Sequence, residues 1–391
     1  MLLRLLITMI LVLLVPPTCF DCLWMRGNGW SWKRIMLWLP FLLILAIGIG
    51  IVTIWKYTPQ NACATGAFFI AFLAVGIPSC ILAIFALISR IFKNNLYRKS
   101  IMALGLTIGA IIFAIIMIGY FYGSRKLVVK HTEIALHNIP EAFNGYTIVQ
   151  FSDLHLGTYG RHRDNVERLV RAINAEKPNL IVFTGDIVNY NIDELKPFCS
   201  ILGQISAPDG VFSVMGNHDY LCYQRWKTKH DQLNAIHQLQ QDERDMGWNL
   251  LLNSHAIITH NGDSIAIIGV ENDGRPPFPQ FGDLRKAQKG LPDVCASGSP
   301  MMKILLSHDP THWQRRVLPE TDIQLTLSGH THGTQCSIFG WSPAQLLYKE
   351  WGGLYEKAGR YLYVSTGIGQ VLIPFRFGIW PQIETITLKK Q

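Results

Sequence analysis

The chain has 391 residues, of which 49% are hydrophobic and only 16% are charged, and its formal net charge at pH 7 is +8. This composition is too apolar for a wholly soluble protein, and the length suffices for two or three domains. Many of the basic residues lie in linkers between apolar runs, which accounts for part of the positive charge. We therefore expect no nucleic-acid binding.

Apolar runs near the N-terminus predict membrane-spanning helices. Three runs without a charged residue reach the roughly 20 residues that cross a hydrocarbon layer. They are Met36–Trp55, Ala62–Ile88 and Ile101–Ser124. An earlier run, Leu5–Pro17, is shorter, and we interpret it as an uncleaved span or an interfacial segment, with a signal-like apolar region as the alternative. Residues 1–124 are thus predicted to be a multi-pass transmembrane region of three to four helices, at about 5–20, 36–55, 64–88 and 101–122.

The basic residues of the short loops predict how this region is oriented in the cell membrane. The loop before Met36 holds three Lys or Arg residues and the loop before Ile101 holds four, whereas the loop before Ala62 holds one. Loops rich in Lys and Arg favour the cytoplasmic side, so the domain after Ser124 is expected to be extracytoplasmic. Basic residues directly after Ser124 argue in the opposite direction. The eight cysteines are compatible with one or two disulfides or with free thiols.

The rest of the chain has the pattern of an α/β domain. We expect a linker and first strand over residues 125–144 and the domain proper over 145–391. The predicted strands are Tyr146–Phe151, Asn179–Thr184, Val211–Met215, Trp248–Leu252, His255–Thr259, Ser264–Val270, Met302–Leu306, Ile323–Leu327, Tyr361–Ser365 and Glu384–Leu388. The predicted helices are Arg163–Ala175, Asp193–Gln204 and Tyr223–Met246. So many strands need more than one sheet, and polar residues at their carboxyl ends predict a ligand site there.

Five strand ends carry side chains that bind metals. They are Asp153 and His155, then Asp186, then Asn217 and His218, then His308, and last His330 and His332. Carboxylate, imidazole and amide groups suit divalent or trivalent ions such as Mn, Fe or Zn. They are too many for one ion, and a shared carboxylate can hold two ions roughly 3.5–4 Å apart that activate water and clamp a phosphoryl group. Each motif alone could be an ordinary turn, but five in succession predict a binuclear metal centre.

These motifs resemble those of the calcineurin-like metallophosphoesterase superfamily. The family series D-x-H, G-D, G-N-H-[DE], a lone H and G-H-x-H is complete and in order, over roughly Tyr146 to Leu388. The stretches Thr147–His155 and Ser365–Gly369, with Arg376, resemble the membrane-associated branch typified by the bacterial YaeI and YkuE phosphoesterases. That branch usually has glycine where this chain has Thr334, which affects the loop beyond the ligands and leaves both histidines in place.

The resemblance implies an αββα two-sheet sandwich, preceded here by the helical membrane region, and a role for each motif residue. The implied ligands are Asp153, His155 and His332 for the first metal, Asn217, His308 and His330 for the second, and Asp186 as the bridge. His218 would face the substrate as proton donor or charge stabiliser, and Asp219 would orient it from behind. The implied reaction is hydrolysis of a phosphoester or pyrophosphate bond by a hydroxide that bridges the two ions.

Membrane anchoring makes a lipid-linked or envelope substrate a candidate. The expected partners are a phosphorylated substrate and membrane lipids. The alternative is an inactive membrane receptor or scaffold that uses the same domain for binding, although the intact ligand set argues against it; a transporter is disfavoured because the spans lack interior charges. An aromatic segment, Pro374–Trp380, with Trp341, Tyr348 and Trp351, either forms an apolar rim near the bilayer or packs in the core.

Overall fold

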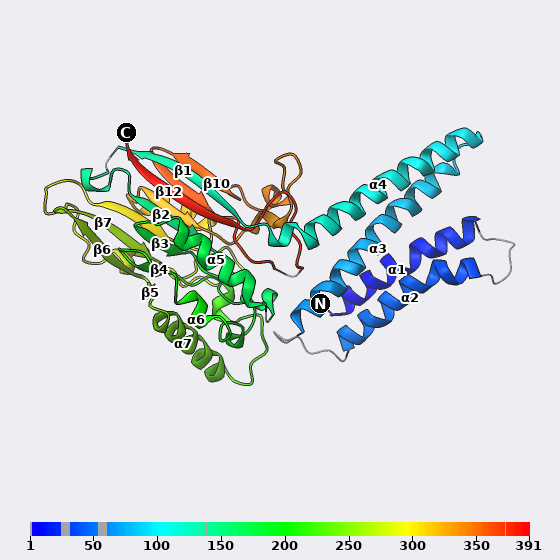
Figure 1. The fold of residues 1–391 in the computed structure, drawn as a ribbon, viewed down its shortest axis with the longest axis horizontal. Helices are drawn as coiled ribbons and strands as arrows, with labels where there is room; N and C mark the ends of the chain where they lie inside the picture. The colour runs from blue at the N-terminus through cyan, green and yellow to red at the C-terminus, as the bar shows by residue number, and fades with distance from the viewer. Residues whose placement is uncertain (1, 25–31, 54–60, 138, 161, 372) are drawn as a thin grey trace. The chain divides into compact units, whose positions relative to one another are not determined.

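The computed structural model describes residues 2–24, 32–53, 61–137, 139–160, 162–371 and 373–391. The chain forms two compact units. One unit comprises Met1–Tyr122 together with Leu372–Phe377, and the other comprises Gly123–Val371 and Gly378–Gln391. Figure 1 shows the first as a set of long helices in blue and cyan, and the second as a sheet-containing part in green to red. The chain therefore passes between the two units three times.

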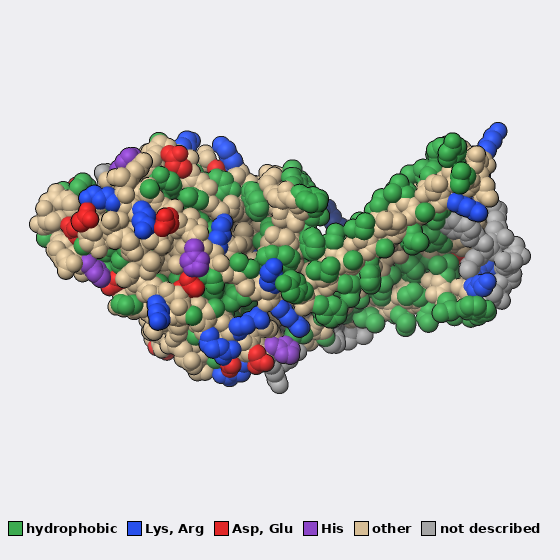
Figure 2. Space-filling view, turned by 45° about the horizontal axis from the view of Figure 1, so that its top comes forward, with side chains coloured by type: hydrophobic (Ala, Val, Ile, Leu, Met, Phe, Trp, Pro, Cys, Tyr) green, Lys and Arg blue, Asp and Glu red, His purple; other side chains and the backbone are tan. Residues whose placement is uncertain are grey.

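Four long helices make up the first unit. They are α1 (Leu2–Trp24), α2 (Trp32–Thr53), α3 (Ala62–Ser89) and α4 (Asn95–Phe121). Each is long and apolar enough to cross a membrane, including α1, for which the sequence left alternatives open. The candidate spans have 18 to 31 residues, and the longest, Asn95–Arg125, continues beyond the end of α4. Hydrophobic side chains cover most of the surface of these helices in Figure 2, as expected of helices that face lipid on several sides.

A short segment from near the C-terminus also belongs to the helical unit. The backbone N–H of Arg376 donates to the carbonyl of Gly119 in α4 at 3.2 Å. The ring of Phe375 lies against Gly119, and Pro374 lies against Gly66 of α3. Phe375 packs with side chains of α3 and α4, namely Ile70, Ala74 and Ile116. The sequence left two alternatives for the aromatic segment, an apolar rim near the bilayer or packing in the core. Phe375 is packed, and its partners are side chains of α3 and α4.

Two six-stranded sheets form the core of the second unit. The first sheet has the order β1-β12-β2-β3-β4-β5 and the second has the order β10-β11-β9-β8-β7-β6. The strands are β1 (Val128–Leu136), β2 (Thr147–Phe151), β3 (Leu180–Phe183), β4 (Val211–Ser213), β5 (Asn249–Leu250), β6 (Ser254–His260), β7 (Asp263–Gly269), β8 (Met302–Leu306), β9 (Leu325–Ser328), β10 (Gly353–Lys357), β11 (Arg360–Val364) and β12 (Gln382–Lys390). Strands β2 to β5 are parallel to one another, and so are β7, β8 and β9.

The alternation of side chains on each strand explains the layers. On β3, Leu180 and Val182 point into the core between the two sheets, whereas Ile181 and Phe183 point toward outer helices. Those helices are α5 (Arg163–Ala175), α6 (Cys199–Leu202) and α7 (Lys229–Asp245), which Figure 1 shows along the first sheet. The short α8 (Leu284–Gln288) packs on the outer face of the second sheet. Because such strands are buried on both faces, their sequences are continuous apolar runs. The predicted αββα sandwich is confirmed.

Some predicted elements differ from those observed. The helix expected over Asp193–Gln204 is only a 3-10 turn (Ile192–Glu194) followed by the four-residue α6, because Pro197 has no N–H for a helix interior. Helix α7 begins at Lys229 rather than Tyr223, since Thr228 and Asp231 form a capping box there. Strand β10 was not predicted. All eight cysteines are free thiols, which is the second of the two alternatives that the sequence left open.

Candidate metal centre

The metal-ligand candidates lie on the loops that follow five parallel strands. Those strands are β2, β3 and β4 of the first sheet and β8 and β9 of the second, and their carboxyl ends meet at one edge of the sandwich. Several of the candidate residues have a left-handed backbone although they are not glycine: Asp153 (φ 55), His155 (φ 43), Asp186 (φ 62), His330 (φ 75) and His332 (φ 51). Such conformations cost free energy and persist where the surroundings enforce them, typically at functional sites.

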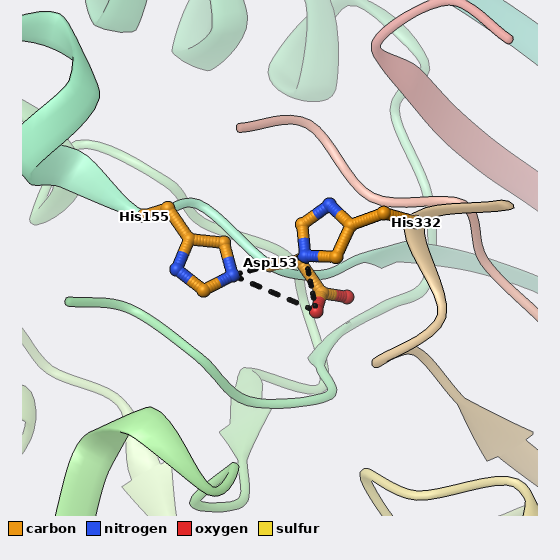
Figure 3. Close-up of side chains that lie close together, drawn as sticks. All are labelled: Asp153, His155 and His332. Carbon is orange, nitrogen blue, oxygen red and sulfur yellow. Dashed lines mark hydrogen bonds and ion pairs between the residues drawn. The ribbon is translucent and has the colours of Figure 1, made fainter. Parts of the chain in front are cut away.

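Asp153, His155 and His332 form the first group of metal-binding side chains (Figure 3). Nε2 of His155 lies 3.0 Å from Nε2 of His332, and Oδ1 of Asp153 lies 3.2 Å from Nε2 of His332. The carboxylate is fixed from behind, because the backbone N–H of His330 donates to both of its oxygens at 3.1 and 3.0 Å. All three side chains are buried. Two imidazole nitrogens and a carboxylate oxygen therefore converge on one point, as ligands of a cation do.

Asp186, His308 and His330 form a second group. Nε2 of His308 lies 3.1 Å from Oδ2 of Asp186 and 3.3 Å from Nδ1 of His330. His308 keeps Nε2 turned to the group because its Nδ1–H donates to the carbonyl of Thr184 at 2.7 Å. This second-sphere hydrogen bond fixes the imidazole orientation that a metal ligand needs.

Asn217 supplies a further acceptor that fits a cation. Its Oδ1 is buried and has no hydrogen-bond partner among the described residues, although its Nδ2 donates to the hydroxyl of Tyr223 at 2.9 Å. A buried amide oxygen without a partner costs free energy, and a bound ion would relieve that cost. The residues present thus fit two metal ions in number, in kind and in their unmet bonding capacity.

Asp186 joins the two groups. Its Oδ2 lies 3.6 Å from Nε2 of His155 in the first group and 3.1 Å from Nε2 of His308 in the second. Its Oδ1 accepts the backbone N–H of His218 at 2.8 Å, which fixes the carboxylate plane. The carboxylate of Asp186 therefore lies within reach of ligand candidates from both groups.

The electrostatics of the cluster favour bound positive charge. Burial would raise the pKa of Asp186, but His308 and then His218 hold it well below its usual range. Burial would lower the pKa of His308, but the carboxylate of Asp186 raises it to about 10. Burial, with His218 and His332 nearby, holds the pKa of His155 well below 6.5, so this imidazole is neutral and able to bind a metal. With their pKa values held below the usual range, the carboxylates of Asp153 and Asp186 remain ionised and draw positive charge to the position where an ion would sit.

His218 lies beside both groups, within reach of His155 and Asp186. Its Nδ1–H donates to the carbonyl of Asn189 at 2.7 Å, which leaves Nε2 for the site. The ring of Tyr223 packs on the imidazole with 4.4 Å between ring centroids.

The position of Asp219 corrects one prediction. Its Oδ2 accepts the backbone N–H groups of Asp186 and Gly216 at 2.8 Å each, and its Oδ1 accepts that of Ile187 at 2.9 Å. The expectation that Asp219 orients the imidazole of His218 is therefore wrong, because the carbonyl of Asn189 holds that ring. Burial, followed by the charge of Asp186, raises the pKa of Asp219 to about 7. Asp219 instead fixes the loop that carries the bridging carboxylate.

Two residues near His330 were not singled out from the sequence for this site. The hydroxyl of Tyr348 lies 2.9 Å from Nε2 of His330, and Oδ2 of Asp309 lies 3.6 Å from the same atom. Asp309 is buried, and its Oδ2 has no hydrogen-bond partner in the described part of the chain. Asp309 directly follows the ligand candidate His308, so its position in the sequence could have indicated that it lies near the site. Tyr348 lies 18 residues from His330, and no spacing rule points to it.

The fold and the site together have the features of a phosphoesterase domain with candidate metal ligands. The sequence model of the family described as "Calcineurin-like phosphoesterase" matches residues 146–334. The "Uncharacterized metallophosphoesterase YkuE" of Bacillus subtilis is 30% identical over 300 residues, which cover 72% of this chain and 94% of that protein. The chain belongs to the calcineurin-like metallophosphoesterase family, and its resemblance to the YkuE-like branch is confirmed.

Two vertebrate relatives are named for both a membrane region and this domain. The "Transmembrane protein with metallophosphoesterase domain" of Danio rerio is 30% identical over 305 residues, covering 75% of this chain and 63% of that protein. Its namesake in Bos taurus is 30% identical over 281 residues, covering 70% and 60%. The chain thus spans less than two thirds of either relative. With the four apolar helices, these names support a membrane protein.

Proposed function

We propose that this protein is a membrane-anchored phosphoesterase that hydrolyses a phosphoester or pyrophosphate bond with two metal ions. The observation that carries the proposal is the position of Asp186, whose Oδ2 faces His155 at 3.6 Å and His308 at 3.1 Å. The first ion would be held by Asp153, His155 and His332, the second by Asn217, His308 and His330, and both by Asp186.

Bound ions would supply a bridging hydroxide nucleophile and positive charge for the phosphoryl oxygens. The protein residues position and protonate the substrate around them. Because Nδ1 of His218 donates to Asn189, its Nε2 is the atom that can pass a proton to the leaving oxygen or donate a hydrogen bond to a phosphoryl oxygen. Tyr223 packs on that imidazole, and its hydroxyl accepts a hydrogen bond from Nδ2 of Asn217. It therefore fixes the position of His218 relative to Asn217.

The substrate is proposed to be a lipid-linked or envelope phosphoester on the extracytoplasmic side of the cell membrane. If all four apolar helices span the membrane, the even number of passes would put the N-terminus and the phosphoesterase unit on the same side. Basic residues gather around the first and third connections, counting the starts of the helices that follow: Arg26, Lys33 and Arg34 before and at the start of α2, and Arg90, Lys93, Arg98 and Lys99 before and at the start of α4. This favours the cytoplasm for these two connections and the opposite side for the phosphoesterase unit. An anchored enzyme meets membrane-bound substrates at a high effective concentration.

The test uses the full chain in lipid nanodiscs, loaded with Mn²⁺ and freed of excess metal. We expect about two ions per chain by elemental analysis. We also expect turnover of at least one of p-nitrophenyl phosphate, bis-p-nitrophenyl phosphate, nucleoside diphosphates and phosphorylated lipids, with Asp186→Asn as the inactive control. Two bound ions without turnover of any of these would favour the receptor or scaffold, and no bound metal under these conditions would refute the proposal.

A further inference from the structure

The segment that follows the last metal-ligand motif presents an unusual apolar surface. It contains no Lys, Arg, Asp or Glu from Gly333 to Tyr348. Five of its large apolar side chains are exposed, with these fractions of their surface open to solvent: Ile338 42%, Phe339 105%, Trp341 51%, Leu346 76% and Leu347 66%. We refer to residues 337–347 as the apolar loop. Single exposed apolar residues are common on soluble domains, but five within ten residues mark an interaction surface.

The apolar loop has a defined backbone that holds these side chains outward. Ile338 and Trp341 exchange backbone hydrogen bonds at 2.9 and 3.0 Å. The hydroxyl of Ser342 donates to the carbonyl of Gly333 at 2.6 Å and accepts the N–H of Ala344 at 3.1 Å. Ser342, in the middle of the loop, is thus tied to Gly333 of the phosphoesterase unit, while the residues on either side of it expose their hydrophobic groups.

The base of the apolar loop lies where the chain leaves the phosphoesterase unit for the helical one. The side chain of Gln335 donates to the carbonyl of Val371 at 3.1 Å and accepts its N–H at 2.7 Å. The carbonyl of Ser337 lies directly against Gly378. Val371 and Gly378 flank the segment Leu372–Phe377, which belongs to the helical unit. The loop therefore emerges beside both ends of the segment Leu372–Phe377.

The other end of the apolar loop reaches the metal centre. Tyr348, the residue after the loop, places its hydroxyl 2.9 Å from Nε2 of His330. At the start, Thr334 bonds Ser342 through their hydroxyls at 3.2 Å, two residues after the ligand His332. Whatever the apolar loop contacts therefore lies close to the metal centre.

We propose that the apolar loop inserts into the surface of the lipid bilayer and holds the metal centre at the level of lipid phosphate groups. Its composition is that of an interfacial anchor, with aromatic and leucine side chains and no charge. The bilayer is the favoured occupant over a soluble protein, because the four helices of the same chain keep it close. The contact itself is independent of catalysis; its consequence for lipid-linked substrates rests on the proposed function.

Lipid-soluble photolabelling tests the contact without reference to activity. The full chain is reconstituted in phosphatidylcholine–phosphatidylglycerol vesicles and irradiated with an apolar diazirine, with glutathione to scavenge reagent in the water. We expect label on Phe339 and Trp341 comparable to that on Ile111 and Phe113, which are exposed on α4. Val294, which is 56% exposed in the phosphoesterase unit, is the matched control and should stay unlabelled. Label on Phe339 and Trp341 no higher than on Val294 would overturn the proposal, and would leave a protein partner as the occupant.

A triple variant separates the contact from the chemistry. Phe339→Ser, Leu346→Ser and Leu347→Ser change only side chains that are largely solvent-exposed, so the fold should be retained. We expect label on Trp341 to be lost and kcat/KM for a phosphatidic acid probe in the vesicles to fall about tenfold. Turnover of water-soluble p-nitrophenyl phosphate should be unchanged. Loss of neither label nor lipid turnover would refute the role of the loop, whereas absence of all turnover in the wild type, with label present, would refute only the proposed function.

Discussion

The interaction between Asp309 and His330 should control the affinity of the second metal position. Nδ1 of His330 faces Nε2 of His308 at 3.3 Å, so Nδ1 is the nitrogen available to a metal and the ring proton must sit on Nε2. That Nε2 lies 2.9 Å from the hydroxyl of Tyr348 and 3.6 Å from Oδ2 of Asp309. Asp309→Asn removes the negative charge and can place an NH₂ group against the Nε2–H. Both changes favour the tautomer with the proton on Nδ1, which cannot bind a metal.

The expected size follows from what such carboxylate–imidazole–metal arrangements contribute. Loss of the outer carboxylate typically lowers metal affinity about 10- to 100-fold, which corresponds to about 1.4–2.7 kcal/mol. Asp309 is buried and its Oδ2 has no hydrogen-bond partner among the described residues, so water screens the interaction little. We expect the upper half of this range for Asp309→Asn. Tyr348→Phe should have a smaller effect, because it removes a neutral hydrogen-bond partner of Nε2 and leaves the negative charge of Asp309 beside it.

Titration of the apo protein with Mn²⁺ would measure this effect. Elemental analysis gives the total occupancy, and the electron paramagnetic resonance signal of a coupled Mn pair reports the filled binuclear centre. Asp309→Asn should retain the first ion and require about 10–100 times more Mn²⁺ for the coupled signal. Thr311→Val is the matched control, since Thr311 bonds Asp309 only through its backbone N–H and its hydroxyl lacks a partner in the described structure. An unchanged coupled signal in Asp309→Asn would refute the reasoning.

Three further changes probe the site and its support. Asp186→Asn should abolish turnover and lower the occupancy of both metal positions, as elemental analysis would show; loss of a single ion would contradict its bridging role. His218→Asn should cut kcat by about 10²–10⁴-fold with both ions retained, and a vacant metal position in this variant would mean that His218 is a ligand. Burial raises the pKa of Glu243 to about 8, so the folded state holds a proton that the unfolded state releases above about pH 4.5, and the wild type should lose about 3 kcal/mol of stability between pH 4.5 and 7. Glu243→Gln should flatten that pH dependence in unfolding followed by circular dichroism, and an unchanged slope would exclude Glu243 as its source.

Local sequence patterns predicted the two-sheet sandwich, and they also predicted which loops carry the residues of the candidate site. Strands such as β3 and β8 are short, continuous apolar runs that are followed by Gly or polar residues. The sequence alone therefore predicts where these strands lie and where the polar residues that follow them begin. Elements decided by a single residue were less predictable. Pro197 divides a helical pattern that is otherwise convincing, and Thr228 with Asp231 moves the start of α7 by six residues from Tyr223.

The contacts made by each site residue could not be predicted in the same way, because they depend on tertiary neighbours. Asp219 stands beside His218 in the sequence, yet its carboxylate turns to the backbone of Asp186 and Gly216. The reason is that a 3-10 turn at His218–Tyr220 directs the two side chains to different sides of the loop. The partner of the imidazole, Asn189, comes from the loop after another strand. A sequence motif therefore identifies which residues gather at the site more reliably than it identifies which of them bond one another.

Thr334 shows how a departure from the branch pattern is accommodated. Its φ of 49° lies in the left-handed region, where a β-branched residue is disfavoured and the glycine usual in this branch is not. The hydroxyl of Thr334 makes bonds that glycine cannot make, to the carbonyl of Gly333 at 2.8 Å and to the hydroxyl of Ser342 at 3.2 Å. Ser342 also binds the carbonyl of Gly333. The cost in backbone conformation is thus offset by bonds that tie the loop of His332 to the apolar loop, so the substitution stiffens the connection between the metal centre and the surface proposed to contact lipid.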